Sequence, residues 1–270
     1  MTAPCSVFYD GLDHPECVAV HRDGSVWCGG EAGQVYRIEP DGSAAEQVAS
    51  TGGFCLGLAF DAGDNLLVCD MKLSAVFRVD ARTHRVERFA DGAGGRRMRL
   101  PNFPVVDAAG RVYVSDSHAF GEPGPGVFRF GPDGEGELWY GEPVAFANGL
   151  ALAPDGGSLY VAESFGPGVF RVPILPDGSA GARVEVARLP GTVPDGIAFG
   201  PDGLLYVGCY EPSRVLRLGP DGAVEVVAAD PIAHMLCHPT NVAFRGSTLF
   251  AANLGRWHVT AIDVSAFVKV

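Results

Sequence analysis

The chain has little that would direct it to a membrane or to nucleic acid. None of its apolar runs is long enough to cross a bilayer, and Met1–Pro4 begins no charged-then-apolar signal segment. The net charge is −12 at pH 7, and no basic patch with interleaved aromatic residues occurs. Electrostatics therefore disfavour nucleic acid and anionic membrane surfaces as partners. We expect a cytoplasmic protein that acts on a small molecule, and the sequence leaves monomer and dimer equally open.

Disulfide frameworks and amphipathic helices are also missing. The seven cysteines are an odd number without framework spacing, so we expect reduced thiols, several of them in the core. No segment has the pattern of a substantial amphipathic helix. Glycine and proline, in contrast, number 37 and 20 and are spread evenly along the chain. This even spread of turn residues, with 47% hydrophobic residues, favours one all-β domain over residues 1–270.

A unit of two apolar strands joined by a tight turn recurs six times. The clearest copy runs from Ala147 to Glu163, with a Pro-Asp-Gly turn at residues 154–156 between its strands. Third and fourth strands follow in most copies, for example at Val169–Arg171 and Val184–Ala187. The period of roughly 40–47 residues is typical of propeller blades. The sequence thus predicts a six-bladed β-propeller with four antiparallel strands in each blade.

The sixth copy has no obvious fourth strand of its own. The N-terminal segment Ser6–Asp10 resembles a fourth strand without a blade. We predict that it pairs with the last blade and closes the ring, which removes an open sheet edge. The tail Ala266–Val270 is the competing candidate for that place.

The residues that start the first strand of each copy form a predicted inner ring at one mouth of the channel, because first strands line the channel of a propeller. They are Glu16, Leu56, Asn102, Asn148, Asp195 and Thr240. Glu16, Asn148 and Asp195 would bring together two carboxylates and an amide oxygen. That set suits one divalent metal ion, Ca²⁺ foremost, with Zn²⁺, Mn²⁺ or Mg²⁺ as alternatives. Strand-end caps that accept backbone N–H groups are the other interpretation, and spacing leaves both open.

A predicted outer ring lies at the same mouth, where the second strands end. It consists of Gly30, Asp70, Asp116, Glu163, Cys209 and Asn253. Among the histidines of the mouth loops, His118 follows Asp116 closely, and we predict it as a general acid or base. Several aromatic residues, Phe103, Phe146, Phe165 and Trp257 among them, are expected either to line an apolar pocket or to pack between blade tops.

Four short motifs resemble the senescence-marker protein / gluconolactonase / luciferin-regenerating enzyme superfamily. They are Pro15-Glu16, Pro101-Asn102, Asn148-Gly149-Leu150 and Pro194-Asp195-Gly196, and the similarity extends over essentially the whole chain. The resemblance implies a six-bladed propeller that holds one divalent cation at the channel mouth, in a family with many sugar lactonases. It also implies that Glu16, Asn148 and Asp195 ligate the metal and that Asn102 helps to hold the substrate.

The chain departs from that family near Asn102. Leu100 stands where the lactonases commonly have an arginine, and Phe103-Pro104 replaces their Asp-Gly. Arg99 is a candidate to reach into the site instead. Because a polyhydroxylated sugar acid needs several hydrogen-bond partners, these changes point to a less polar substrate.

The leading hypothesis is a metal-dependent hydrolase of a lactone or related cyclic ester. Asp195 or His118 would collect the proton of the attacking water. The predicted substrate-binding residues are Asn102, Phe103, Arg99, Phe146, Glu163, Phe165 and Trp257.

Two other functions remain open at this point. The segment from Asn148 to Ser164 is also similar to strictosidine synthase-like propellers, which suggests a cyclase, isomerase or condensing enzyme. A non-enzymatic binding propeller is the third hypothesis, since a fold does not determine a function. The joint presence of Glu16 and Asp195 favours the metal-dependent hydrolase.

Overall fold

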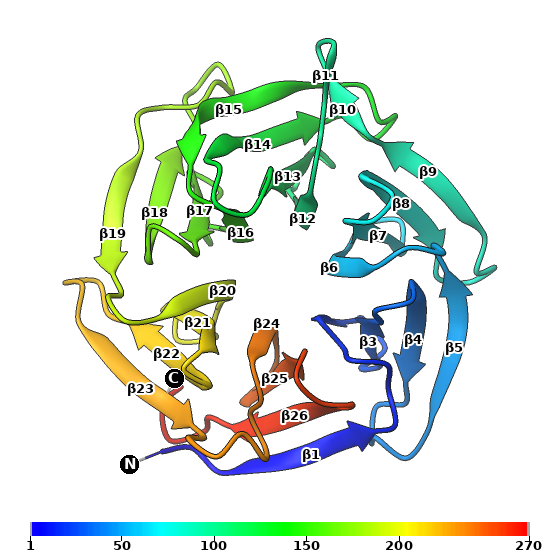
Figure 1. Cartoon of the computed structure of the whole chain (residues 1–270), viewed down its shortest axis with the longest axis vertical. Helices are drawn as coiled ribbons and strands as arrows, with labels where there is room; N and C mark the ends of the chain where they lie inside the picture. Colours follow the sequence, from blue (N-terminus) through cyan, green and yellow to red (C-terminus); the bar gives the residue numbers. More distant parts are fainter. Residues whose placement is uncertain (1, 269–270) are drawn as a thin grey trace.

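The structure, a computed structural model, describes residues 2–268 as a ring of six four-stranded antiparallel sheets around one axis (Figure 1). Within these residues there is no helix, and hence none that could cross a membrane. The predicted all-β, six-bladed propeller is confirmed. The predicted domain runs over residues 1–270, of which residues 1, 269 and 270 lie outside the described part.

Each of the first five blades is one continuous stretch of chain, with its strands in sequence order from the axis outward. Blades 1 and 2 consist of β2 (Cys17–Val20), β3 (Val26–Gly29), β4 (Gln34–Ile38) and β5 (Ala45–Ser50), then β6 (Cys55–Phe60), β7 (Asn65–Asp70), β8 (Ala75–Asp80) and β9 (Val86–Ala90). Blades 3 and 4 consist of β12 (Pro101–Val106), β13 (Val112–Asp116), β14 (Gly124–Phe130) and β15 (Gly136–Val144), then β16 (Ala147–Leu152), β17 (Ser158–Glu163), β18 (Gly168–Pro173) and β19 (Val184–Arg188). Blade 5 consists of β20 (Val193–Phe199), β21 (Leu205–Glu211), β22 (Arg214–Leu218) and β23 (Val224–Ala229).

The sixth blade joins the two ends of the chain. It contains β24 (Pro239–Arg245), β25 (Thr248–Asn253) and β26 (His258–Asp263), and its outermost strand is β1 (Cys5–Asp10). β1 pairs antiparallel with β26, from Cys5 opposite Ile262 to Asp10 opposite His258, which confirms the predicted closure. In the competing tail, the N–H groups of Phe267 and Val268 both bond to the carbonyl of Val264, so its described part is a turn. Residues 269 and 270 of that tail lie outside the described residues.

One small element has no counterpart in the other blades. β10 (Gly92–Ala93) and β11 (Arg96–Arg97) form a short hairpin between blades 2 and 3, which the sequence reading did not predict. It projects at the rim of the ring in Figure 1. The segment that follows it leads into β12 and so carries Arg99 and Leu100 to the channel mouth.

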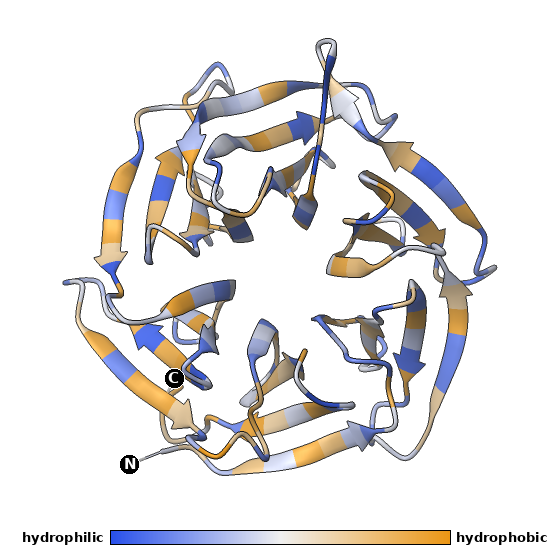
Figure 2. Ribbon diagram, viewed as in Figure 1, coloured by the Kyte–Doolittle hydropathy of each residue, from blue (hydrophilic) through white to orange (hydrophobic). Residues whose placement is uncertain are grey.

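Apolar and polar residues alternate along the outer strands, as the colour bands of Figure 2 show, whereas inner strands such as β16 are buried along nearly their whole length. Tight turns join them: the Oδ1 atom of Asp155 accepts the N–H of Gly157 at 2.8 Å, and Gly156 between them has a φ of 69°. The hydrophobic cores lie between neighbouring blades. In one of them Tyr113 and Trp139 of blade 3 pack with Leu159 and Phe170 of blade 4. All seven cysteines are free thiols, as predicted.

An irregular register recurs at the start of the innermost strand in blades 2 to 6. In blade 4, Ala147 pairs with Glu163 and Leu150 with Val161, so two residues, Asn148 and Gly149, face the single Ala162. The same extra residue occurs in the other four of these blades, at residues 56–57, 102–103, 195–196 and 240–241. Such β-bulges change the direction of a side chain. Each inner-ring residue of blades 2 to 6 is therefore the first residue of a bulge.

Glycine is often the second bulge residue because the inner strands approach one another closely there. A Cβ atom on Gly149 would lie 2.6 Å from the Cα atom of Gly196 and from the carbonyl oxygen of Asp195. A Cβ atom on Gly196 would lie 2.5 Å from the Cα atom of Asn241. The glycines therefore allow neighbouring innermost strands to lie close together around the channel mouth.

Candidate active site

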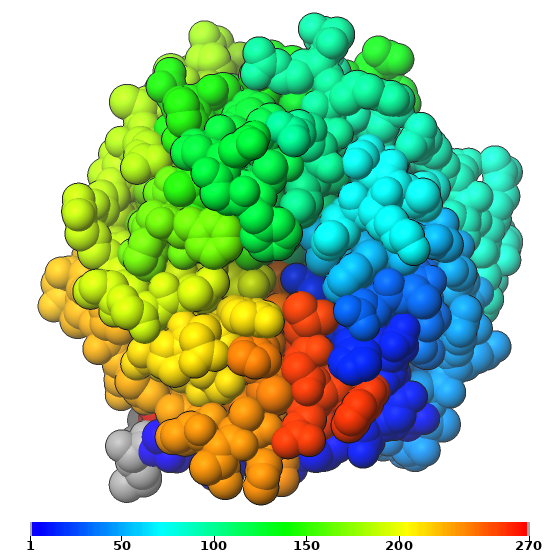
Figure 3. Space-filling model, viewed as in Figure 1, coloured from blue at the N-terminus to red at the C-terminus, as the bar shows by residue number. Residues whose placement is uncertain are grey.

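A cavity of about 390 Å³ lies at the channel mouth. Figure 3 shows the surface hollowed at the centre of the ring, where the blades meet. All six inner-ring residues line it, although they are far apart in the chain. The repeat thus brings Glu16, Asn102, Asn148 and Asp195 to one place.

The polar floor of the cavity contains two buried carboxyl groups. The side chains of Glu16 and Asp195 belong to residues only 4% and 6% exposed, and the Nδ2 atom of Asn241 donates to Oε2 of Glu16 at 2.9 Å. Burial raises the pKa of Glu16 well above its usual value, the nearby Asp195 carboxyl raises it further, and the Asn241 hydrogen bond opposes both. Burial also raises the pKa of Asp195, to about 7. Two carboxylates without a counter-charge destabilise one another here.

Three buried oxygen atoms of residues that line the cavity have no hydrogen-bond partner among residues 2–268. They are Oδ1 of Asn102, Asn148 and Asp195, from blades 3, 4 and 5. Oδ1 of Asn241 in blade 6 is unpaired too, but it lies beside Gly196, and Asn241 does not line the cavity. A buried acceptor without a partner costs about 1–3 kcal/mol. Amide and carboxylate oxygens gathered in one cavity, with those of Glu16 and Asp195 among them, are the kind of ligand that a hard divalent cation prefers. The residues present therefore fit such an ion, and Glu16, Asn148 and Asp195 are the ones that would hold it.

Two serines set the direction of the asparagine amides. Ser164 donates its hydroxyl proton to the carbonyl of Pro194 at 2.7 Å, so toward Asn148 it accepts, and the Nδ2 atom of Asn148 donates to it at 3.2 Å. Ser117 does the same for Asn102: it donates to the carbonyl of Ala147 at 2.6 Å and accepts from Nδ2 at 3.0 Å. Each amide consequently turns its Oδ1 atom away from the serine.

Asn241 and these two serines were not predicted from the sequence. Thr240, the predicted residue, uses its hydroxyl to donate to the carbonyl of Glu16, and Asn241 donates to that same carbonyl at 3.0 Å. Available signals were a second polar residue after Thr240 in an otherwise apolar strand, and the serine that follows an outer-ring acid in blades 3 and 4. Neither signal identifies a hydrogen-bond partner without the fold.

The walls of the cavity are mostly apolar. Leu56, Leu100 and Phe146 form a buried hydrophobic cluster of their own, with Phe54 and Met71 packed against it. Other apolar residues complete the lining: Phe120, Phe165, Val193 and Leu254. Phe146 lies in the left-handed backbone region with φ at 67°, a conformation that costs free energy and is concentrated at functional sites.

The outer-ring residues clamp loops rather than line the cavity. Asp116 accepts the N–H groups of Leu100 (2.8 Å), Arg99 (3.0 Å) and His118 (2.9 Å) through its two oxygens. Asp70, Glu163 and Asn253 likewise accept the backbone N–H groups of Phe54, Ala145 and Cys237. Each of these loops leads into the innermost strand of its own blade. Four outer-ring side chains therefore cap strand ends, a role that the sequence suggests for the inner ring.

Five of the predicted site residues do not line the cavity. Phe103 is the second bulge residue of blade 3, so its ring packs in the core with Tyr113 and Val127. Arg99 has an exposed side chain that donates to Nε2 of His118 at 2.9 Å and lies 3.4 Å from Glu122. Arg99 and His118 thus pair with each other outside the cavity. Trp257 is half exposed, and its ring is tilted against that of His14, with 5.5 Å between the centroids.

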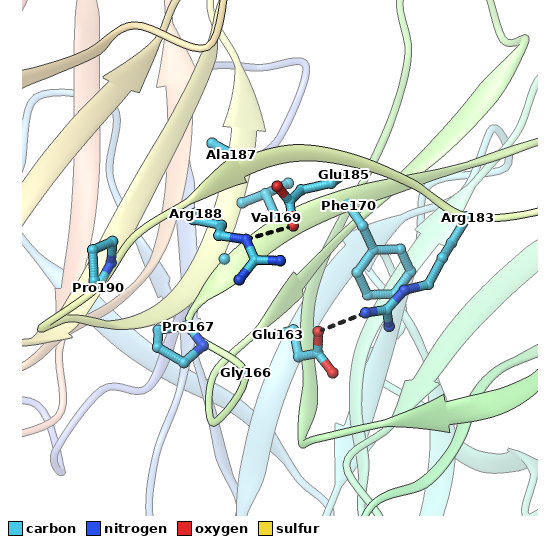
Figure 4. A pocket seen from close by; sticks show the side chains of 11 residues that line it. Glu163, Gly166, Pro167, Val169, Phe170, Arg183, Glu185, Ala187, Arg188 and Pro190 are labelled. Carbon is cyan, nitrogen blue, oxygen red and sulfur yellow. Dashed lines mark hydrogen bonds and ion pairs between the residues drawn. The ribbon is translucent and has the colours of Figure 1, made fainter.

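Glu163, the fifth of them, faces a groove at the edge of blade 4. Figure 4 shows its carboxylate directed toward Arg183, whose guanidinium lies 3.6 Å from Oε2 of Glu163 and 4.7 Å above the ring of Phe170. The other oxygen of Glu163 accepts the N–H of Ala145 at 2.8 Å. Glu163 therefore holds the loop next to Phe146, whereas Asn102, Phe146 and Phe165 do line the cavity.

Comparison with known proteins gives consistent results. The model of the SMP-30/Gluconolactonase/LRE-like region matches residues 14–252. A 6-deoxy-6-sulfogluconolactonase from Pseudomonas putida is 30% identical over 228 residues, which are 83% of this chain and 75% of that protein. The protein STRICTOSIDINE SYNTHASE-LIKE 6 of Arabidopsis thaliana is 28% identical over 77% of this chain, which spans 58% of that protein.

The fold has close counterparts among solved structures. A gluconolactonase from Xanthomonas campestris superposes with a TM-score of 0.82, at 21% identity over 97% of this chain and 89% of that one. At this identity the likeness concerns the fold.

Proposed function

Because this chain belongs to the SMP-30/gluconolactonase/LRE-like family, we propose that it hydrolyses a lactone or related cyclic ester in the central cavity. The observation that carries the proposal is the set of unpaired, buried oxygen atoms of Asn102, Asn148 and Asp195, which come from three blades to one cavity, together with the second buried acid, Glu16. A binding surface gains nothing from such a costly arrangement, whereas a site for a cation and a polar reaction centre requires it. The 30% identical sulfogluconolactonase supports the reaction class.

One divalent cation belongs to the proposal, Ca²⁺ foremost and Zn²⁺, Mn²⁺ or Mg²⁺ as alternatives. Glu16, Asn148 and Asp195 would hold it, with Asn241 fixing Glu16 by hydrogen bonds to its carboxylate and its carbonyl. When bound, such an ion supplies positive charge that polarises a carbonyl oxygen and lowers the pKa of water.

The side chains of the floor divide the reaction among them. Asn102, whose Nδ2 is occupied by Ser117, presents Oδ1 to the cavity and accepts a hydrogen bond from the attacking water. The water oxygen bonds to the lactone carbonyl carbon, and Asp195 takes the proton released. The ring C–O bond then breaks, and Asp195 returns the proton to the leaving oxygen, giving the open-chain hydroxy acid. His118 has no part in this scheme because it does not line the cavity.

Replacement of the proton acceptor tests the proposal. Asp195→Asn should lower kcat/KM for a hydrolysed lactone at least about 100-fold, the usual range for a lost general base. Asp41→Asn, at an exposed acid in the turn between β4 and β5, is the matched control and should leave kcat/KM unchanged. Protein purified without chelator should contain one divalent ion by elemental analysis. Protein without an ion, and without lactone hydrolysis after addition of any of the four ions, would end the proposal.

A second candidate function is a cyclisation or condensation of an apolar intermediate. The apolar walls and the 28% identical strictosidine synthase-like protein favour it. Assay of the same protein with an amine and an aldehyde, beside the lactone panel, separates the two. Amine–aldehyde coupling in the presence of chelator would favour this candidate over the hydrolase.

A further inference from the structure

We infer that the cavity takes an apolar lactone, one whose ring carries an aromatic or branched alkyl group, in preference to a polyhydroxylated sugar lactone. The inference rests on the proposed function and names the substrate class of the same site.

The first observation is the hydrophobic cluster that forms one wall. Leu56, Leu100 and Phe146 are each less than 9% exposed and pack on one another, with Phe54 and Met71 against them. This cluster is separate from the cores between the blades, and all five members line the cavity. A wall of this kind gains free energy when a ligand displaces water from it, and it offers a hydroxyl group no partner.

The second observation is a set of three aromatic rings beside this wall. The ring of Phe146 lies 4.9 Å from that of Phe120 and 4.9 Å from that of Phe165, measured between centroids. Phe120 is 70% exposed and Phe165 is 48% exposed. Neighbouring aromatic rings left in water at a cavity mouth indicate a surface that an apolar partner covers. The three rings together would contact the substituent of the lactone.

The third observation is the shortage of free polar groups on the walls. The hydroxyls of Ser164 and Thr240 are occupied by backbone carbonyls, and the unpaired oxygens of Asn102, Asn148 and Asp195 belong to the proposed reaction centre at the floor. Above the floor, Tyr210 and Glu211, both from β21 on one side, are the only polar side chains that the described residues offer to the cavity. The hydroxyl groups of a sugar lactone on the other sides would be left unpaired, which an apolar substituent avoids.

The test compares two lactones and one analogue that cannot be hydrolysed. The lactones are 3,4-dihydrocoumarin and glucono-1,5-lactone, assayed with the metal-loaded protein. The analogue is 3,4-dihydro-2(1H)-quinolinone, the lactam of the same shape, whose binding to the metal-free protein is measured by calorimetry. The variants are Phe120→Ala and Phe165→Ala, which remove exposed rings and should not affect folding. Leu175→Ala, at a 42% exposed residue outside the cavity, is the control.

We expect kcat/KM for dihydrocoumarin to exceed that for gluconolactone at least tenfold. Each phenylalanine variant should raise the KM for dihydrocoumarin and weaken lactam binding roughly fivefold, with little change for gluconolactone, whereas Leu175→Ala changes neither. Preference for gluconolactone, or lactam binding that is absent or insensitive to both variants, overturns the inference and leaves the hydrolase proposal standing. A third outcome is that the protein hydrolyses no lactone but binds the lactam in a way that depends on Phe120. That outcome supports an apolar ligand in the cavity and overturns the proposal of a hydrolase.

Discussion

Asn102 and Asn148 illustrate how single residues acquire their role from a neighbour. An amide can present either its oxygen or its nitrogen. The orientation here depends on Ser117 and Ser164, whose hydroxyl groups donate to backbone carbonyls and so can only accept from the amides. The amide nitrogens face the serines, and the oxygens remain free for the cavity. Asparagine has a different role elsewhere in the protein. The Oδ1 atom of Asn253 accepts the N–H of Cys237 and so holds a loop.

Removal of one serine should therefore weaken binding of the proposed ion, although the serine is not among its proposed ligands. Ser164→Ala takes away the hydrogen-bond acceptor of Asn148 Nδ2, so the amide loses its fixed orientation. Loss of such an outer partner typically reduces metal affinity 10- to 100-fold, and we expect about tenfold weaker Ca²⁺ binding by calorimetry. Ser179→Ala, at a serine in an exposed turn, is the control. Unchanged affinity in Ser164→Ala would mean that the serine does not orient the amide.

Loops that precede the innermost strands are the elements that carry the site. Outer-ring side chains hold several of them by accepting backbone N–H groups. The loop around Phe146 also depends on two backbone bonds, from Ser164 N to Phe146 O and from Phe165 N to Ala145 O. Because Phe146 adopts a positive φ, the loop needs these bonds to stay in its conformation.

Glu163 should act as a positioning residue for the apolar wall. In Glu163→Ala the N–H of Ala145 loses its acceptor, so Phe146 is less well held, and we expect KM to rise several-fold with kcat and Ca²⁺ affinity nearly unchanged. Glu163→Gln keeps an oxygen at this place and should restore most of the lost affinity for substrate. A large fall in kcat with unchanged KM would instead assign Glu163 to the reaction itself.

The loop between β23 and β24 depends on one carboxylate in a pH-dependent manner. Burial raises the pKa of Asp230, but hydrogen bonds from Met235, Leu236, His234 and Ile232 outweigh it, so that the pKa is lower than usual. An acid with a lowered pKa stabilises the folded state above its unfolded pKa of about 4, and this contribution is lost as the pH falls further.

Asp230→Asn should reveal this contribution. We expect it to lower the free energy of unfolding at pH 7 by about 1 kcal/mol. The difference from the unaltered protein should shrink as the pH falls below about 4, because the aspartate is then protonated too. Urea unfolding at pH 7 and pH 3 measures it. A difference that is equal at the two pH values would contradict an ionic role.

On the scale of the whole molecule, the ring and the floor of the cavity depend on each other. The candidate ligands Glu16, Asn148 and Asp195 belong to three blades, and the proposed ion would tie these blades together. Closure by β1, with Phe8 packed on Phe250 at 4.7 Å, fixes blade 6 beside blade 1. Binding of an ion to the folded ring alone must then raise its stability.

Chelation should lower the melting temperature by an amount that depends on pH. The raised pKa values of Glu16 and Asp195, the latter about 7, mean that the metal-free pair holds protons which a cation must displace. Binding of the proposed ion should therefore be stronger above pH 7 and weaker below it. We expect Ca²⁺ to raise the melting temperature more at pH 8 than at pH 5.5. Equal shifts of the melting temperature at the two pH values would contradict this linkage. The absence of a Ca²⁺-induced shift from the unaltered protein as well as from the control Glu16→Gln would contradict it too.

The sequence alone determined the number of blades and the members of the inner ring, because equivalent positions of a repeat occupy equivalent places around an axis. The N-terminal closing strand followed from the strand that the sixth copy lacks. The tertiary structure decided which way the side chains at the mouth point. The bulge at the innermost strand of blade 3 directs Asn102 into the cavity and Phe103 into the core, and the bulge in blade 6 brings Asn241 against Glu16. An alternating pattern cannot reveal an inserted residue, so only the paired strands show where the alternation breaks.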